Sequence, residues 1–413
     1  MIKFEKFVLS NGLKVIVHQD KSTPLACINI LYDVGSRDEN PEQTGFAHLF
    51  EHLMFGGSIN IPSFDEPLQR VGGENNAFTT NDITNYHLTL PAENLETGFW
   101  LESDRMLSLA FSKKSLDVQR SVVIEEFKQR YLNQPYGDVW LMLRPMAYKV
   151  HPYLWDTIGK EVSHIENAKM DDVKNFFKRF YCPNNAIMVV AGNVEFEKVK
   201  ELSEKWFGPI PKGPDNKRNL PVEPIQTEAR NLSVERNVPS EAIYKAYHMC
   251  ARRDNEYYAT SLISDILSQG NSSRLHKELI KEKGLFSSIN AYTSGDFDKG
   301  LFIVSGKLNK NVTMKQAEQT IDEELQKLKT TFVTDDELTK VKNKIEAAHV
   351  FGEVDVLNKA TNLAVAELLS DASMINEEIN KYLAVTKEQI KEVANVIFKS
   401  ENCSTLYYNK LKN

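Results

Sequence analysis

Residues 48 to 52 combine side-chain types and a spacing that suit metal-assisted hydrolysis. The string is His48-Leu49-Phe50-Glu51-His52. On a helix of 3.6 residues per turn, His48 and His52 project from one face, so both imidazoles can reach one cation. Glu51 lies three residues after His48, where it can hydrogen-bond a water beside the metal without being a ligand itself. This order is the inverted form of the H-E-x-x-H motif, whose metal is zinc.

A catalytic zinc site needs a third protein ligand and keeps a fourth position open for water. The spacing of apolar residues predicts a helix over 118–127 whose buried face includes Val122, Val123 and Phe127. Glu126 follows Val122 by four residues, so it is expected on that face. A carboxylate buried alone costs on the order of several kcal/mol, and a zinc ion would supply the missing partner charge. In the alternative interpretation, the histidine pair is a surface coincidence and Glu126 pairs with an arginine.

The elements expected to position these residues form an α+β pattern. Apolar residues at helical spacing predict a helix over 45–55, around the histidines. An Asn-Gly pair at 11–12 predicts a hairpin between strands at 6–9 and 13–17. Further strands are expected at 26–32 and 186–191, and further helices at 91–109, 115–131, 171–180 and 195–206.

The length of 413 residues predicts more than one domain. Prolines and glycines concentrate between 208 and 226, which is typical of a linker. We place the linker at 213–230. The metal-bearing domain is then expected at 1–212, and a second domain at 231–413.

The order of elements restarts after the linker. Residues 251–270 can be laid over 35–57 with three residues looped out. This overlay sets Ser261, Ser264 and Asp265 of the second copy against His48, Glu51 and His52 of the first. It predicts two structurally similar α/β units, each an antiparallel sheet flanked by helices, related by duplication. Only the first unit then keeps the side chains for a metal. Elements of the second copy are expected at 242–249 and 300–305 (strands) and at 314–329 and 335–370 (helices).

The composition excludes several classes of protein. The net charge of -7 argues against nucleic-acid binding, which normally uses a basic surface. No window approaches 18 uninterrupted apolar residues, so no membrane span is expected. The four cysteines are scattered and the first 19 residues lack the apolar core of a signal peptide. These features favour the cytoplasm, although a chain whose leader had been removed would look the same.

Several strings resemble the pitrilysin/insulin-degrading-enzyme family of zinc peptidases, in particular its short two-domain bacterial and mitochondrial-processing-type members. The resemblance extends over nearly the whole chain and is densest from Gly12 to Tyr153. The matching strings are NGLKVIV (11–17), GSRDE (35–39), TGFAHLFEHLMFGGS (44–58), GGENNAFTTNDITNY (72–86), SDRM (103–106), VVIEEF (122–127) and HPY (151–153). The interval from His52 to Glu126 fits the family's spacing for the third zinc ligand. The resemblance therefore implies one Zn²⁺ per chain, held by His48, His52 and Glu126.

The resemblance also implies a strand that binds substrate. In the family, the segment corresponding to 72–80 forms an edge strand that pairs with an extended peptide. The main chain of Asn76, Ala77, Phe78 and Thr79 would supply the ladder hydrogen bonds without selecting side chains. In the alternative interpretation, this segment is a Gly-Asn turn that leads into an ordinary buried strand.

Two positions depart from the family pattern in ways that bear on activity. Gln119 stands where the family usually has a second glutamate, seven residues before the metal ligand, and it brings no charge to support the ligands. Many relatives also carry an arginine and a tyrosine around a Gly-Leu step in the second domain, where they hold the substrate carbonyl. The corresponding positions here, aligned on residues 284–285, are Ile280 and Ser287. Loss of such donors typically costs about 10²–10³ in rate.

These observations predict a zinc metalloendopeptidase that hydrolyses extended peptides with a zinc-activated water and Glu51 as general base. Because the arginine and tyrosine are missing, we expect a dimer with a similar chain that lacks HxxEH and supplies that pair. Two alternatives fit less well. A non-catalytic core or scaffold subunit has no need of three converging ligands. A hydrolase of non-peptide esters or amides is disfavoured only by the resemblance of the substrate strand.

Overall fold

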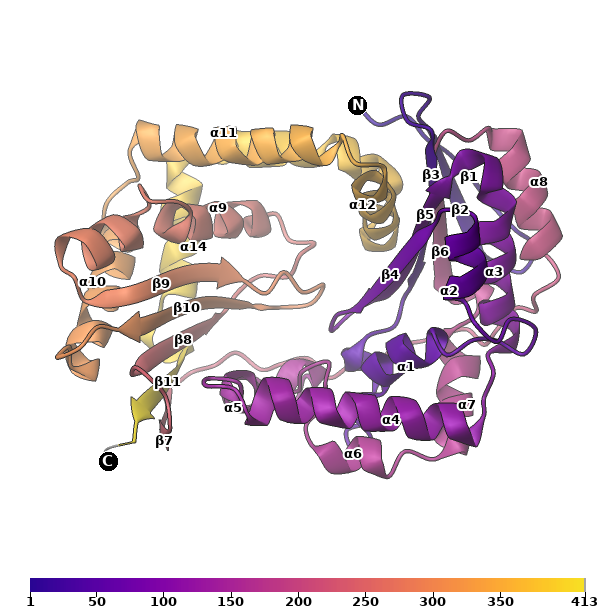
Figure 1. The fold of residues 1–413 in the computed structure, drawn as a ribbon. Coiled ribbons are helices and arrows are strands. Elements are labelled where there is room, and N and C mark those ends of the chain that lie inside the picture. The colour runs from indigo at the N-terminus through magenta and orange to yellow at the C-terminus, as the bar shows by residue number, and fades with distance from the viewer. Residues whose placement is uncertain (412–413) are drawn as a thin grey trace. The chain divides into compact units, whose positions relative to one another are not determined.

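Two β-sheets, one for each half of the chain, organise the fold (Figure 1). The computed structural model describes residues 1–411. Unit 1 comprises Met1–Lys128, Trp155–Leu220 and Val350–Glu377. Unit 2 comprises Gln129–Leu154, Pro221–His349 and Glu378–Asn413.

The sheet of unit 1 has six strands in the order β1-β2-β6-β3-β5-β4. Their bounds are β1 (Glu5–Val8), β2 (Lys14–Gln19), β3 (Leu25–Tyr32), β4 (Glu74–Thr79), β5 (Thr84–Pro91) and β6 (Ala186–Gly192). All neighbours are antiparallel except β2 and β6, which run parallel. The hairpin predicted from the Asn-Gly pair is confirmed by the pairing of β1 with β2. Seven of the eight residues of β3 are buried, because helices cover both faces of the sheet centre.

The helices of unit 1 are α1 (Phe46–Met54), α2 (Asp65–Arg70), α3 (Leu95–Ser108), α4 (Lys113–Phe127), α6 (Val162–Glu166), α7 (Met170–Phe180), α8 (Phe196–Trp206) and α12 (Val356–Leu369). Helix α3 packs on β3 and β5, and a Cβ on Gly98 of this helix would lie 2.8 Å from Ile28 Cδ1. The side chain of Asn29, the next residue along β3, instead accepts a hydrogen bond from Thr361 of α12. Because successive strand residues point to opposite faces, α3 and α12 cover opposite sides of the sheet.

The sheet of unit 2 has five strands in the order β7-β11-β8-β10-β9. Their bounds are β7 (Arg230–Arg236), β8 (Ala242–His248), β9 (Phe286–Thr293), β10 (Leu301–Leu308) and β11 (Cys403–Lys410). The helices of unit 2 are α5 (Val139–Ala147), α9 (Glu256–Ser268), α10 (Met314–Thr330), α11 (Asp335–Gly352, which ends in unit 1), α13 (Glu378–Ala384) and α14 (Lys387–Ile397).

The two sheets share one connectivity, which confirms the predicted pair of similar α/β units. In unit 1, β2 pairs in parallel with β6, as β7 pairs in parallel with β11 in unit 2, and every other pairing is antiparallel. Helix α1 follows β3 as α9 follows β8, and an edge strand comes next in both (β4 and β9). The sheets are therefore mixed rather than purely antiparallel, with one parallel pair each.

Each unit also takes in a helix from the other half of the chain. Helix α12 packs on β3 and β6 of unit 1, while α5 packs on β8 and β11 of unit 2, the equivalent strands. The main division of the chain, between Leu220 and Pro221, lies within the stretch expected as a linker. Residues 129–154 belong to unit 2 and residues 350–377 belong to unit 1. The compact units therefore do not coincide with a division of the chain into 1–212 and 231–413. A sheet with two apolar faces needs covering on both, and here the second cover comes from a distant segment.

Within residues 1–411, no helix combines the length and the apolar character needed to cross a membrane. The four cysteines are all free thiols, and three of them are buried.

Candidate metal site

Helix α1 carries the side chains of its HxxEH motif on one face and packs the opposite face into unit 1. The buried residues are Phe46, Ala47, Leu49, Phe50, Leu53 and Met54. The Phe50 ring stacks on Tyr181 at 5.1 Å between ring centroids and on Phe176 at 5.0 Å. His48, Glu51 and His52 are half-buried on the remaining face. The sequence prediction of an amphipathic helix around the two histidines is confirmed.

Helix α4 lies against α1 and presents Glu126 to the two histidines. Its buried stripe contains Val123 and Phe127, as predicted, but Val122 is 44% exposed. The prediction that Val122 lies on the buried face is therefore wrong. The stripe follows Leu116, Val123 and Phe127 at spacings of seven and four, which turns Val122 outward. Glu126 reaches the site because it lies three residues after Val123, not because it lies four after Val122.

The candidate ligand atoms are spaced as a metal would require. His52 Nε2 lies 3.4 Å from Glu126 Oε2, and His48 Nε2 lies 3.6 Å from the same oxygen. All three ligand atoms fall within 4.8 Å of one another. Ligands held tetrahedrally at about 2.0–2.2 Å from zinc lie about 3.4 Å apart. The donor set and its spacing therefore fit Zn²⁺, and within the described part of the chain this is the one cluster of His, Cys, Asp or Glu with such convergence.

Glu51 is held by a residue of the edge strand. Thr79 Oγ1 donates a hydrogen bond of 2.6 Å to Glu51 Oε2. Thr79 is the last residue of β4, so this bond joins that strand to α1. The sequence predicted both residues in the site but not their contact, because the contact depends on how α1 packs against the sheet.

Strand β4 is the terminal strand of its sheet, paired only with β5 among residues 1–411. Thr80 N donates to Ile83 O across the turn. Because hydrogen-bonded pairs alternate along an antiparallel ladder, the main-chain N–H and C=O groups of the even-numbered residues of the strand point toward β5. Ala77 N instead donates to the side-chain oxygen of Asn76, at 2.9 Å. The main-chain N–H and C=O groups of Ala77 and Thr79 therefore line the free edge. Those of Asn76 and Phe78 point toward β5. Phe78 is 36% exposed.

Gln119 lies on α4, half-buried, two turns before Glu126. A separation of seven residues places the two side chains on one face of the helix. The position is thus compatible with support of the ligands, and its amide adds no charge to them.

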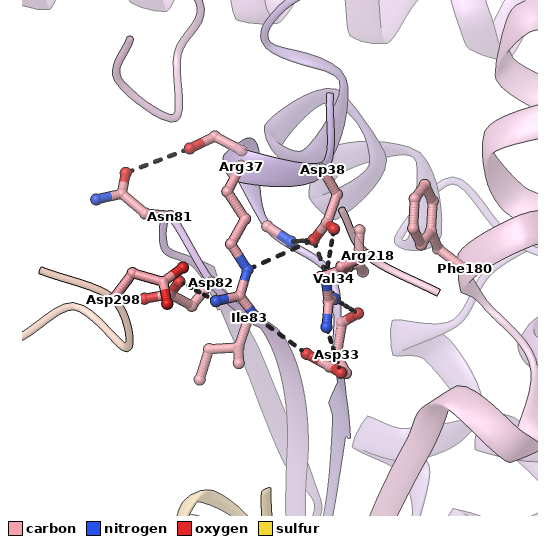
Figure 2. A network of polar contacts seen from close by, with 12 residues as sticks. Asp33, Val34, Arg37, Asp38, Asn81, Asp82, Ile83, Phe180, Arg218 and Asp298 are labelled. Atoms are coloured by element: carbon pink, nitrogen blue, oxygen red, sulfur yellow. Dashed lines mark hydrogen bonds and ion pairs between the residues drawn. The ribbon is translucent and has the colours of Figure 1, made fainter. Parts of the chain in front are cut away.

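A partly buried ionic network fixes the segment that precedes α1 (Figure 2). Arg37 Nη1 lies 2.7 Å from Asp82 Oδ1, and Arg37 Nη2 lies 3.3 Å from Asp33 Oδ1. Arg218 Nε donates to Asp38 Oδ1 and Nη1 to Asp33 Oδ2, both at 2.6 Å. Burial opposes the charge of Arg218, but the hydrogen bonds and charges of Asp38 and Asp33 raise the pKa of its guanidinium overall. The network therefore links three segments distant in sequence.

This network also brings the turn after β4 next to residues 35–37. Arg37 N donates to Asn81 O at 2.9 Å, and Ser36 N donates to Thr80 O at 3.2 Å. The backbones approach so closely that a Cβ on Gly35 would lie 2.4 Å from the Asn81 carbonyl. The GSRDE string thus serves to hold the end of β4 beside α1, which is the contact that Thr79 and Glu51 complete.

The equivalent helix of unit 2 has a different arrangement. Asp265 of α9 forms an ion pair with Lys344 of α11, at 3.4 Å. Ser264 is buried and donates to the carbonyl of Ser261, one turn earlier on α9. A lysine thus supplies the positive charge beside the only acid of the overlaid triplet, and a metal is not needed there.

The two positions aligned with the family's arginine and tyrosine contain neither. Ile280 packs against the hydrophobic core of unit 2. Ser287 is exposed on β9, with its hydroxyl donating to Lys307 O at 3.2 Å. Neither side chain carries a charge or a phenol.

Comparison with known proteins agrees with this geometry. The profile described as "Insulinase (Peptidase family M16)" matches residues 14–151, and that described as "Peptidase M16 inactive domain" matches 167–345. The chain is 32% identical to the zinc protease PqqE of Helicobacter pylori, over 98% of this chain and 92% of that protein. It is 24% identical to the mitochondrial-processing peptidase subunit beta of Saccharomyces cerevisiae, over 82% of this chain and 76% of that protein.

The fold matches that of a solved relative over its full length. The crystal structure of a protease from Helicobacter pylori superposes with a TM-score of 0.93 at 30% identity, covering 99% of this chain and 100% of that one. The "inactive domain" profile, which matches 167–345, covers α9, where Ser261, Ser264 and Asp265 stand in place of the two histidines and the glutamate of α1.

Proposed function

The chain belongs to the insulinase family of peptidases, M16, and from this premise we propose that it is a zinc-dependent endopeptidase whose general base is Glu51. The observation that carries the proposal is the convergence of His48, His52 and Glu126, with Glu51 on the same helix face as the histidines. Relatives named as zinc proteases support it.

His48, His52 and Glu126 would hold one Zn²⁺ per chain. When bound there, zinc supplies Lewis-acid chemistry and lowers the pKa of a water toward about 7. Glu51 accepts the proton of the attacking water and returns it to the leaving amine. Thr79 donates to Glu51 Oε2, which keeps the carboxylate turned toward the site.

We assign peptide binding to the free edge of β4. An extended peptide can add to the sheet as a further strand, with main-chain hydrogen bonds to Ala77 and Thr79. The Asn76 amide oxygen occupies the Ala77 N–H, so it must be displaced when the peptide pairs. Backbone pairing of this kind accommodates many sequences, which suits a peptidase of broad specificity.

Thr79→Val is expected to lower kcat by about 10- to 100-fold with a much smaller change in KM. Valine is isosteric but cannot donate to Glu51, and a hydrogen bond to a charged group is worth about 1.5–3 kcal/mol. Thr79→Ser keeps the hydroxyl and should restore most of the rate. Steady-state kinetics of the three proteins on one quenched peptide would test this. Equal losses in the serine and valine variants would refute the role of the hydroxyl.

We further propose that the working enzyme is a dimer with a similar chain that lacks HxxEH and supplies an arginine and a tyrosine. Ile280 and Ser287 cannot stabilise a developing oxyanion as that pair would. The relative from Saccharomyces cerevisiae is by its name one subunit, which supports a division of labour between two chains.

A single set of assays tests these proposals against the alternatives. Zinc is measured by elemental analysis, and hydrolysis of quenched peptides is followed with the chain alone and with the candidate partner chain. One zinc per chain and hydrolysis that rises at least 100-fold with the partner are expected. Full activity of the isolated chain would refute the need for a partner. Zinc without hydrolysis under either condition would favour a scaffold subunit, and cleavage of esters but not peptides would favour the non-peptide hydrolase.

A further inference from the structure

The N-terminus of α1 receives its cap from a residue outside the helix. The N-cap position is Gly45, which has no side chain to bond the first N–H groups. Gly45 is required there because its φ is +89° and a Cβ would lie 2.7 Å from Ile158 O. The first N–H groups of a helix have no acceptor within the helix, so they need other acceptors when they are buried. The acceptor must therefore come from elsewhere in the chain.

Glu39 provides that acceptor. Gly45 N donates to Glu39 Oε2 at 2.9 Å, and Ala47 N donates to Glu39 Oε1 at 2.8 Å. Trp155 Nε1 donates to Oε2 as well, at 3.1 Å. The side chain is buried, with 6% of its surface exposed. Both carboxylate oxygens are thus engaged by N–H donors, and two of the three donors belong to the start of the helix that carries the site.

The charge state of Glu39 matters for this cap. Burial raises the pKa of its carboxyl to about 8, against the opposing effect of the N–H groups of Ala47, Gly45 and Trp155. Because the folded-state pKa exceeds the ordinary value, ionisation of Glu39 destabilises the fold. This destabilisation grows as pH rises from about 4.5 to about 8. A buried acid with a perturbed pKa, whose oxygens accept from the start of the helix bearing HxxEH, is a candidate for a functional role.

We propose that Glu39 is a positioning residue of the metal site, whose carboxylate fixes the start of α1 and thereby the direction in which His48 and His52 meet Glu126. In its ionised form the carboxylate also complements the positive end of the helix dipole. Glu39 touches neither the metal ligands nor Glu51, so its effect is transmitted through the first turn of α1. The proposal rests on the proposed metal site, and it is independent of peptidase activity.

The neighbouring segment is anchored so that Glu39 can act as a fixed support. Thr44 is fully buried, and its hydroxyl lies 2.8 Å from His164 Nδ1 and accepts from Lys160 N at 2.8 Å. Trp155 Nε1 also donates to Ser36 O, at 2.9 Å. Both ends of the 36–45 segment are therefore bound to residues 155–164 of unit 1. Loss of the carboxylate would release the helix start while leaving these anchors in place.

The test is Glu39→Gln, in which one oxygen becomes an NH₂ group that faces N–H donors. The Kd for zinc is measured by competition with a chelator, and the visible absorption spectrum of the cobalt-substituted protein reports the ligand geometry. We expect zinc binding about 5- to 30-fold weaker than wild type, a loss of the size that removal of a helix cap causes. We also expect an altered cobalt spectrum. Unchanged zinc affinity and an unchanged spectrum would overturn the proposal.

The chain offers a matched control in unit 2. Glu223 is also a buried carboxylate, and it accepts from three backbone N–H groups, those of Lys149, Val150 and His151. Glu223→Gln should lower stability comparably but leave the Kd for zinc and the cobalt spectrum unchanged. An equal loss of zinc affinity in both variants would assign the effect to general destabilisation and overturn the proposal.

A second variant covers the case in which Glu39→Gln does not fold. Glu39→Asp keeps the carboxyl group but is shorter by one methylene, so it can reach only part of the donor set, and about 2- to 5-fold weaker zinc binding is expected. Wild-type affinity in this variant would overturn the proposal. Zinc binding by the wild-type chain without peptide hydrolysis would count against the proposed function alone, because both readouts for Glu39 are of metal binding.

Discussion

Replacing Glu51 with glutamine is expected to lower peptide hydrolysis by about 10²- to 10⁴-fold while zinc stays at one equivalent per chain. General acid–base catalysis contributes about this much to a rate, and the amide cannot accept the proton of the attacking water. Metal content should not change, because Glu51 is not among the three converging ligand atoms. The two measurements are single-turnover hydrolysis of a quenched peptide and elemental analysis of the same preparation.

The control for Glu51→Gln is the same change at Glu125. That carboxylate lies on the exposed side of α4, with 60% of its side chain accessible and an ion pair to Lys128. Glu125→Gln should retain both zinc and activity. Hydrolysis within a few-fold of wild type in the Glu51 variant would remove Glu51 from the mechanism, whatever the state of the metal.

Replacing His48 with alanine is expected to abolish stoichiometric zinc and, with it, all hydrolysis. Two remaining ligands on separate helices cannot close a site that needs three. Because a ligand that binds only the folded state stabilises it, wild type should gain about 2.7 kcal/mol of unfolding free energy at zinc concentrations 100 times the Kd. The variant should gain none. Denaturant unfolding with zinc and with chelator measures this difference.

A histidine outside the site provides the comparison for His48→Ala. His276 lies in unit 2, half-buried, and belongs to no ligand cluster. Its replacement by alanine should leave zinc content and zinc-linked stability at wild-type values. A His48 variant that still bound one zinc per chain would refute the ligand assignment and require a different donor.

The helix around HxxEH was predictable from local periodicity, and the two similar units were predictable from the restart in the order of elements after the linker. Apolar spacing over 45–55 gave α1 within one residue at each end. The overlay of 251–270 on 35–57 anticipated that α9 follows β8 as α1 follows β3. The resemblance pointed to Glu126, although the burial argument for it relied on Val122, which is exposed. Helical spacing alone predicts which residues lie on the buried face of a helix only to within a residue or two.

Contacts between distant segments could not be predicted in this way. The Thr79–Glu51 hydrogen bond depends on the placement of β4 at the sheet edge beside α1. Arg218 lies in the stretch expected as a linker, yet it is bound by Asp33 and Asp38 of unit 1. Strand β5 was missed because its residues, TNYHLTLP, mix polar and apolar types, and its pairing with β3 decides its conformation. Each of these features is set by tertiary packing, which overrides local preference.

The reciprocal exchange of α5 and α12 has a consequence for the order of events during synthesis. Unit 1 includes Val350–Glu377, so the ribosome must make this distant segment, which follows most of unit 2, before α12 can cover β3 and β6. A nascent chain that already contains His48, His52 and Glu126 therefore still has one face of its sheet uncovered. Unit 1 is completed only after the segment that contains α12 has been made, and a product terminated before Val356 is left without the helix that covers this face of the sheet.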